Sequence, residues 1–254
     1  MTRIQRLLAA GMAVALTATA SAQATPSPTG HVTIVLVHGA LIDGSSWRGV
    51  FDVLTRDGYP VSVAQPPLTG LEEDVAATKR VIDQLDGPVI LVGNSYGGSI
   101  ITVAGSDPKV KALVYVAALQ PDVGETSAEV APPNKQATNN LRQTKDGFIS
   151  LDPNKFAADI GADLPKDTAD FMARSQMPIM GAAFSTKLSA AAWRDKPSYV
   201  IIATEDHELD PAVARRMANR AGSKVMVLKG SHLIFVSHPR AVAKVIETAA
   251  HAVK

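Results

Sequence analysis

The sequence contains no cysteine among its 254 residues. Disulfide bonds therefore cannot brace the fold, and a lipid anchor attached to a cysteine is excluded. A chain of this length can bury a core large enough to fold without such cross-links. Long runs of like charge are missing too, because 25 basic and 24 acidic residues are mixed along the chain. Without a basic stripe to neutralise phosphates, nucleic-acid binding is excluded as a function class.

The chain also lacks an apolar run long enough to span a bilayer. Arg3 and Arg6 precede an apolar stretch over residues 7–16, shorter than the ~20 residues that a spanning helix needs. Small residues follow it, as at a signal-peptide cleavage site. The pattern predicts a signal peptide over residues 1–24 and a solvated leader over 25–30. The mature protein is then periplasmic or secreted, with no stable membrane insertion after cleavage.

Five short apolar runs are separated by helical patterns. The runs are apolar on both faces, as are strands of a parallel sheet that helices cover from both sides. Amphipathic segments between them place apolar residues on one helical face. This alternation predicts an α/β fold with a doubly wound, mostly parallel sheet. The predicted strands are Thr33–Val37, Val89–Val92, Leu113–Val116, Tyr199–Ile202 and Val225–Leu228.

The alternation breaks between about residues 120 and 193, where no strand is predicted. Turn signals at 131–134 are followed by helical stretches that begin near Asp152 and Leu164. An interruption this long between two strands predicts an inserted helical cap rather than a loop. The segment is rich in Met and Phe, which indicates that it covers an apolar, adaptable ligand pocket.

The most informative motif is Gly93-Asn94-Ser95-Tyr96-Gly97, which directly follows the apolar run at 89–92. A helix is predicted over residues 99–104, directly after it. Strand, Gly-x-Ser-x-Gly turn and helix in this order are typical of a nucleophile elbow, where a strained turn presents the serine hydroxyl. The glycines let strand and helix pass closely without Cβ clashes. The motif therefore predicts Ser95 as the nucleophile.

His232 is the strongest candidate for the general base among six histidines. It follows the predicted strand 225–228 and precedes the last helix, so it emerges at the same sheet edge as Ser95. His31, next to the leader, and His251, near the C-terminus, are predicted to be exposed.

Four carboxylates lie between residues 205 and 210, just past another predicted strand. Asp210 precedes a proline and is expected to cap the next helix. Asp206 is the preferred partner of His232, because a short side chain just past the strand end can reach the imidazole. Glu205 is the alternative.

Two backbone amides are predicted to stabilise the oxyanion: that of Tyr96, which follows the nucleophile, and that of Ala40, in the loop after the first strand. In this scheme His232 takes the proton of Ser95 and later gives it to the leaving group. Asp206 orients the imidazole and stabilises its cation. The oxyanion loop, the nucleophile elbow, the acid and the histidine occur together in this order along the chain. Their combination indicates a serine hydrolase more specifically than any one of them does.

With these motifs in place, the chain resembles the α/β-hydrolase superfamily over residues 31–254. Within it, the chain is similar to the plant methylesterase and hydroxynitrile lyase branch and its small bacterial relatives. The resemblance implies a triad of Ser95, Asp206 and His232, a small-molecule ester substrate, and neither cofactor nor metal. The residues that carry it are Val35–Ala40 with Trp47, Gly93–Gly98, Thr204–Asp206 and Gly230–His232.

Three positions depart from that branch. Hydroxynitrile lyases place a threonine where Gly39 stands and a lysine directly after the catalytic histidine, where this chain has Leu233. No cation is then available for a departing cyanide. Asn94 replaces the histidine that usually precedes the nucleophile. The sequence thus favours a carboxylesterase for small or medium esters. The alternatives are lactone hydrolysis, lyase chemistry, cofactor-free oxygenation, and a ligand-binding protein that retains the triad.

Overall fold

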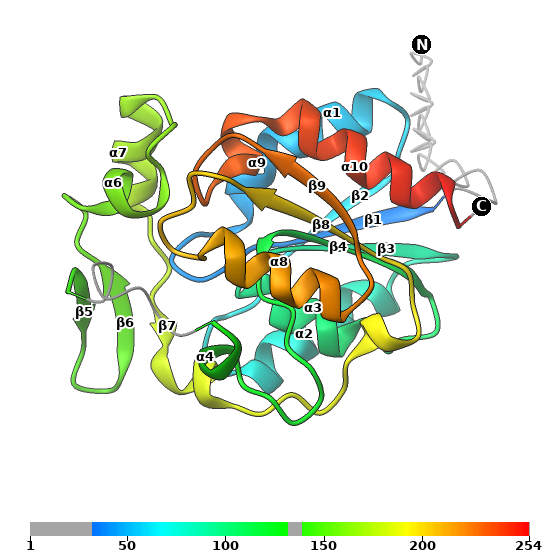
Figure 1. Ribbon diagram of the computed structural model, residues 1–254, viewed down its shortest axis with the longest axis horizontal. Coiled ribbons are helices and arrows are strands. Elements are labelled where there is room, and N and C mark those ends of the chain that lie inside the picture. Colours follow the sequence, from blue (N-terminus) through cyan, green and yellow to red (C-terminus); the bar gives the residue numbers. More distant parts are fainter. Residues whose placement is uncertain (1–31, 132–138, 254) are drawn as a thin grey trace, which may run out of the picture.

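The computed structural model describes residues 32–131 and 139–253 (Figure 1). The predicted signal peptide (1–24) and leader (25–30) lie outside these ranges. A six-stranded parallel sheet forms the centre, in the order β2-β1-β3-β4-β8-β9, so the predicted doubly wound α/β fold is confirmed. Its strands are β1 (Thr33–Val37), β2 (Val61–Ala64), β3 (Val89–Ser95), β4 (Val110–Ala118), β8 (Ser198–Ala203) and β9 (Lys224–Leu228).

The two edge strands of the sheet, β2 and β9, differ from the sequence prediction. The edge strand β2 is missing from the predicted set, because only four residues form it and they are mostly half-buried. The prediction that β9 is covered on both faces is wrong, since Met226 and Val227 are 43 % and 45 % exposed. As the last strand, β9 pairs only with β8.

Helices cover the sheet from both sides. Three pack on one face: α1 (Arg48–Arg56), α9 (Ile234–Ser237) and α10 (Pro239–His251). The opposite face carries α2 (Leu71–Asp83), α3 (Gly97–Ala104) and α8 (Pro211–Arg220). Figure 1 shows these layers above and below the strands.

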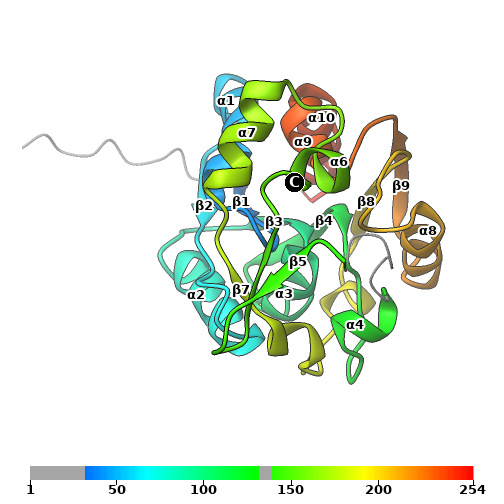
Figure 2. The same cartoon turned by 90° about the vertical axis from the view of Figure 1, so that its left-hand side faces the viewer.

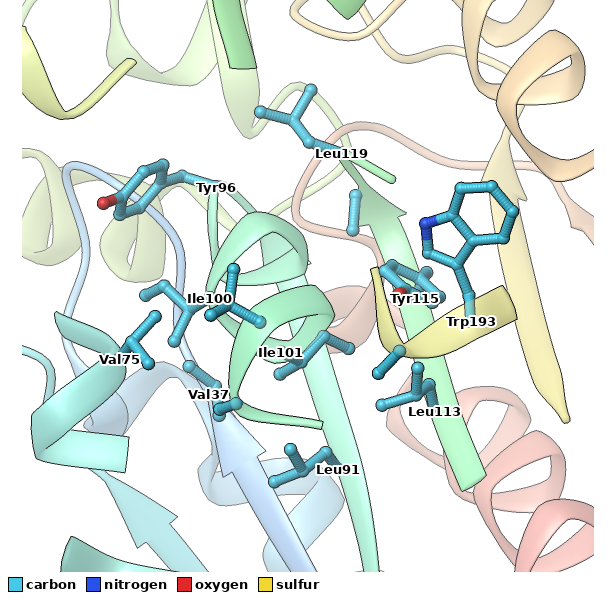
Figure 3. Packing of buried hydrophobic residues seen from close by; sticks show 14 of the residues in the cluster. Val37, Val75, Leu91, Tyr96, Ile100, Ile101, Leu113, Tyr115, Leu119 and Trp193 are labelled. Atoms are coloured by element: carbon cyan, nitrogen blue, oxygen red, sulfur yellow. The ribbon is translucent and has the colours of Figure 1, made fainter. Parts of the chain in front are cut away.

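Alternation along each strand divides the core into two clusters. In β1, Ile34 and Leu36 face α1 and α10, whereas Val35 and Val37 face α2 and α3. Figure 3 shows the cluster on the α2 and α3 side of the sheet. There Tyr115 and other side chains of the sheet meet residues of α2 and α3. Each fully buried aliphatic side chain of this kind contributes roughly 1.5–3 kcal/mol to folding.

The insertion between β4 and β8 contains strands as well as helices, so the prediction that it has no strand is wrong. Its helices are α4 (Ser127–Val130), α6 (Phe156–Ile160) and α7 (Lys166–Arg174), with 3-10 turns at Gly181–Ser185 and Ala192–Arg194. Between them β5 (Leu141–Gln143), β6 (Phe148–Leu151) and β7 (Ile179–Met180) form a small antiparallel sheet. In Figure 2, α6, α7, β5 and β7 lie toward the viewer, in front of one end of the large sheet.

The small sheet escapes prediction because its strands are two to four residues long. One local signal for it exists, however. Asp146-Gly147 is a typical hairpin turn, and Gly147 has a φ of 93°, which a glycine tolerates best. This turn joins β5 to β6 in antiparallel register.

Candidate active site

The turn between β3 and α3 has the geometry of a nucleophile elbow. Ser95, the last residue of β3, has a φ of 53°, which is a strained value for a residue with a side chain. A Cβ on Gly98 would lie 2.0 Å from the carbonyl oxygen of Leu119, and one on Gly97 would lie 2.7 Å from that of His38. Only glycine fits at either position, and the tight turn directs the hydroxyl of Ser95 out of the sheet edge.

His232 lies in the loop between β9 and α9 and contacts two of the predicted site residues. Its Nε2 accepts the hydroxyl hydrogen of Ser95 at 2.8 Å, and its Nδ1 donates to Oδ2 of Asp206 at 2.8 Å. The imidazole is almost fully buried. Burial alone lowers the pKa of His232, but the charge and hydrogen bond of Asp206, together with the charge of Glu208, outweigh it and raise this pKa overall. Asp206 therefore favours the imidazolium that proton transfer from Ser95 would create.

Asp206 is held in place by the backbone that follows it. Its Oδ1 accepts hydrogen bonds from the amides of Glu208, at 2.9 Å, and Leu209, at 2.8 Å. These bonds fix the carboxylate and leave Oδ2 for His232.

The other candidates for the acid lie elsewhere. Glu205 points outward, with its side chain 51 % exposed, and forms an ion pair with Lys229 at 3.5 Å. Asp210 caps α8 by accepting from the amide of Ala212 at 2.7 Å, as predicted. Among the carboxylates of this loop, only Asp206 hydrogen-bonds the imidazole of His232.

The loop after β1 brings the second predicted oxyanion donor close to the nucleophile. A Cβ on Gly39 would lie 2.8 Å from Cβ of Ser95, so this loop packs directly on the elbow. Ala40 lines the same cavity as Ser95. The backbone hydrogen bonds found outside regular elements in 32–131 and 139–253 include none donated by the amides of Ala40 or Tyr96. Their role as oxyanion donors stays a prediction.

A cavity of about 250 Å³ opens beside Ser95 and His232. Its walls are mostly apolar, and residues of the insertion form much of them. This agrees with the prediction that the insertion covers an apolar pocket. The lining differs from the predicted Met- and Phe-rich set: Phe184 contributes, but Phe171 is 66 % exposed. The insertion lines the cavity with Ala128, Leu141, Ile149, Ile160, Ile179 and Phe184.

Asp74 supports the elbow from α2, a role that no motif indicates. The hydroxyl of Tyr96 donates to Oδ2 of Asp74 at 2.9 Å, and the amide of Leu68 donates to Oδ1 at 2.6 Å. The ring of Tyr96 also packs against that of Phe184, with centroids 5.3 Å apart. Complete burial raises the pKa of Asp74 to about 6, although both hydrogen bonds oppose the rise.

This raised pKa predicts a pH-dependent difference in stability. Because folded Asp74 keeps its proton to a higher pH than the unfolded chain, it makes the folded state lose stability as pH rises from about 4 to about 6. Asp74→Asn removes that loss. Relative to the wild type, its free energy of unfolding is expected to improve by on the order of 2 kcal/mol between about pH 4 and pH 7.

Urea unfolding at several pH values measures this difference. Glu72→Gln, at an exposed carboxylate in the same helical turn, is the control and should track the wild type. A difference between Asp74→Asn and wild type that does not change with pH would contradict the prediction.

Asn94 and Leu233, two of the positions at which the sequence differs from the hydroxynitrile lyase branch, are buried and do not line the cavity. Asn94 donates to the carbonyl oxygen of Val116 at 3.0 Å, while its own Oδ1 has no partner. Leu233 is 1 % exposed and packs in the core cluster of α1 and α10. No group at either position offers a positive charge to a bound substrate.

The described ranges show no cluster of three or more His, Asp or Glu side chains that could hold a metal ion. Within the same ranges, no helix is long and apolar enough to cross a membrane.

Comparison with known proteins places this geometry in a family. The model of the Alpha/beta hydrolase family matches residues 34–245. The alpha/beta hydrolase nvfD of Aspergillus novofumigatus is 26 % identical over 243 residues, which cover 85 % of this chain and 96 % of that protein. A carbendazim hydrolyzing esterase of Nocardioides sp. is 33 % identical over 114 residues, which cover 39 % and 46 % of the two chains.

Solved structures share the fold. A pyrethroid hydrolase from Sphingobium faniae JZ-2 superimposes with a TM-score of 0.75 at 23 % identity, covering 87 % of this chain and 98 % of that one. A methylesterase from Arabidopsis gives a TM-score of 0.72 at 18 % identity, covering 87 % and 99 %. The family model spans most of the sequence, so the predicted resemblance is confirmed: the chain belongs to the alpha/beta hydrolase family.

Proposed function

We propose that the protein is a carboxylesterase that cleaves small esters through an acyl-enzyme. The observation that carries this proposal is the hydrogen-bonded chain from Ser95 through His232 to Asp206, which opens on an apolar cavity. A serine hydroxyl next to a base, with the base oriented by a carboxylate, is the arrangement that acyl transfer needs.

The geometry supports a two-step reaction. His232 removes the proton of Ser95 as the hydroxyl oxygen attacks the ester carbonyl. The amides of Ala40 and Tyr96 stabilise the negative oxygen, and the imidazolium then protonates the departing alcohol. Water, activated by the same imidazole, cleaves the acyl-enzyme and restores Ser95.

The substrate class follows from the cavity and from the relatives. A volume of about 250 Å³ lies below the roughly 300–1,000 Å³ typical of pockets for drug-sized ligands, so small esters fit best. Esterase and pyrethroid hydrolase activities named for similar proteins support ester cleavage here as well.

Ester hydrolysis is favoured over cyanohydrin cleavage at this site. A lyase must stabilise departing cyanide, yet Leu233 beside His232 is apolar and buried. We expect measurable hydrolysis of short p-nitrophenyl esters, and no release of cyanide from mandelonitrile above the uncatalysed rate. Parallel assays of p-nitrophenol and cyanide measure both. Fast cyanide release that Ser95→Ala abolishes, without ester turnover, would replace the esterase by a lyase.

We further propose that the protein is exported to the periplasm or the medium. The basic residues Arg3 and Arg6 followed by a short apolar run support this. Intact-mass measurement of the expressed full-length protein is expected to find a mature chain that starts after Ala22 or Ala24. A mass that retains residues 1–22 in the exported fraction would refute cleavage there.

A further inference from the structure

Glu208 places a carboxylate in the wall of the cavity, close to the proposed triad. It lies two residues after Asp206, and its own amide donates to Oδ1 of that residue at 2.9 Å. This bond ties the position of Glu208 to that of the proposed catalytic acid. Glu208 lines the cavity together with Ser95 and His232.

The carboxylate of Glu208 makes no hydrogen bond with the triad, although its charge helps to raise the pKa of His232. Both ring nitrogens of His232 are already engaged, one by Ser95 and the other by Asp206. In the described part of the chain, no hydrogen bond or ion pair involves the side chain of Glu208. The charged groups near it are His232, Asp206 and Asp159.

The surroundings of Glu208 disfavour an unpaired charge. Burial raises the pKa of Glu208; the imidazole of His232 opposes this effect, while the carboxylates of Asp206 and Asp159 add to it. The cavity wall next to it includes the apolar side chains of Ile160 and Leu209. A ligand that supplies a positive charge or donor offsets the cost of desolvating such a carboxylate, whereas an apolar ligand does not.

We infer that Glu208 makes the site selective for esters that carry an alkylammonium group, held by its carboxylate within the apolar cavity beside Ser95. This inference rests on the proposed esterase function and narrows its substrate class. Ser127, another polar side chain of the cavity wall, is engaged with Ser99 at 2.8 Å and carries no charge. Glu208 is therefore the group suited to attract a cation.

Two acetate esters of nearly equal shape test the inference: acetylcholine, and 3,3-dimethylbutyl acetate, in which a neutral tert-butyl group replaces the trimethylammonium. The wild type is expected to show the higher kcat/KM for acetylcholine. Glu208→Gln is expected to lower the acetylcholine-to-neutral ratio at least about tenfold, because the Coulombic attraction between the carboxylate and the quaternary ammonium is lost. The neutral ester should lose much less than acetylcholine does, so the ratio of the two is the readout. Glu205→Gln, which removes an exposed carboxylate of the same loop, is the matched control and should keep the wild-type ratio.

The pH profile provides a second readout. Since burial raises the pKa of Glu208, the wild-type ratio is expected to fall as pH is lowered through that pKa. In Glu208→Gln the ratio should not depend on pH. Effects of protonating His232 cancel, because they act on both esters.

Equal losses on both esters in Glu208→Gln would overturn the inference and assign Glu208 to the electrostatics of His232. An unchanged ratio would overturn it as well. If the wild type hydrolyses neither these two esters nor p-nitrophenyl acetate, the proposed function fails separately. Calorimetric binding of choline against 3,3-dimethylbutan-1-ol then decides the selectivity without turnover: tighter binding of choline that Glu208→Gln abolishes supports it, and equal binding refutes it.

Discussion

Replacement of Ser95 by alanine is expected to lower kcat/KM for p-nitrophenyl acetate by about three or more orders of magnitude. The variant loses the atom that would form the acyl bond, and His232 loses its hydrogen-bond partner at Nε2. The fold should persist, because alanine keeps the Cβ that packs against Gly39. Ester turnover and labelling by a fluorophosphonate probe measure the loss.

Ser127→Ala is the matched control, since it removes another hydroxyl from the same cavity. Its Oγ pairs with Ser99 and has no imidazole beside it, so we expect a loss of less than about tenfold. Retention of most activity and labelling by Ser95→Ala would show that the elbow does not supply the nucleophile. Labelling of the wild type without turnover of any ester would instead favour a ligand-binding role.

Asp206→Asn is expected to cost on the order of four decades in kcat. An asparagine here faces incompatible demands, because one oxygen of Asp206 accepts two backbone amides and the other accepts Nδ1–H of His232. Turning the new NH2 toward His232 forces the imidazole into the wrong tautomer. Turning it toward the backbone instead opposes donors to donors and destabilises the loop.

Glu205→Gln and Asp210→Asn are the controls for Asp206→Asn. Each removes one negative charge from the same loop without touching the hydrogen bond to His232. Glu205 is exposed and paired with Lys229, while Asn at 210 can still cap α8. Both variants are expected to keep activity within about threefold of the wild type. Circular dichroism would check that Asp206→Asn folds, and a larger loss in either control would move the acid to another carboxylate of the loop.

The insertion and the large sheet contribute different parts of the site. Side chains of the insertion line much of the cavity, while Ser95 ends β3 and both Asp206 and His232 lie in loops that follow strands of the large sheet. Changes in the insertion are therefore expected to alter which ester binds more than how the ester is cleaved. The contact between Tyr96 and Phe184 is one direct link between the two regions.

Several features were determined by the sequence alone. The strand, Gly-x-Ser-x-Gly turn and helix around Ser95 are local, because a positive φ and close backbone contacts restrict which residues can form the turn. The placement of His232 after β9 could be predicted for a general reason: carboxyl ends of parallel strands meet at one edge, so residues 137 apart come together. Side-chain length favours Asp206 over Glu205, and Asp206 is the residue that hydrogen-bonds the imidazole.

Only the tertiary structure decided the rest. The strands β5 to β7 are too short to show a periodicity, and the exposure of β9 depends on its place at the edge of the sheet. Asp74 meets Tyr96 across 22 residues, and Glu208 reaches the cavity wall through the path of its loop. A carboxylate has the same letter in the sequence whether it lies in solvent or in an apolar cavity. Its pKa and its possible partners are set by side chains from distant segments, which no local pattern encodes.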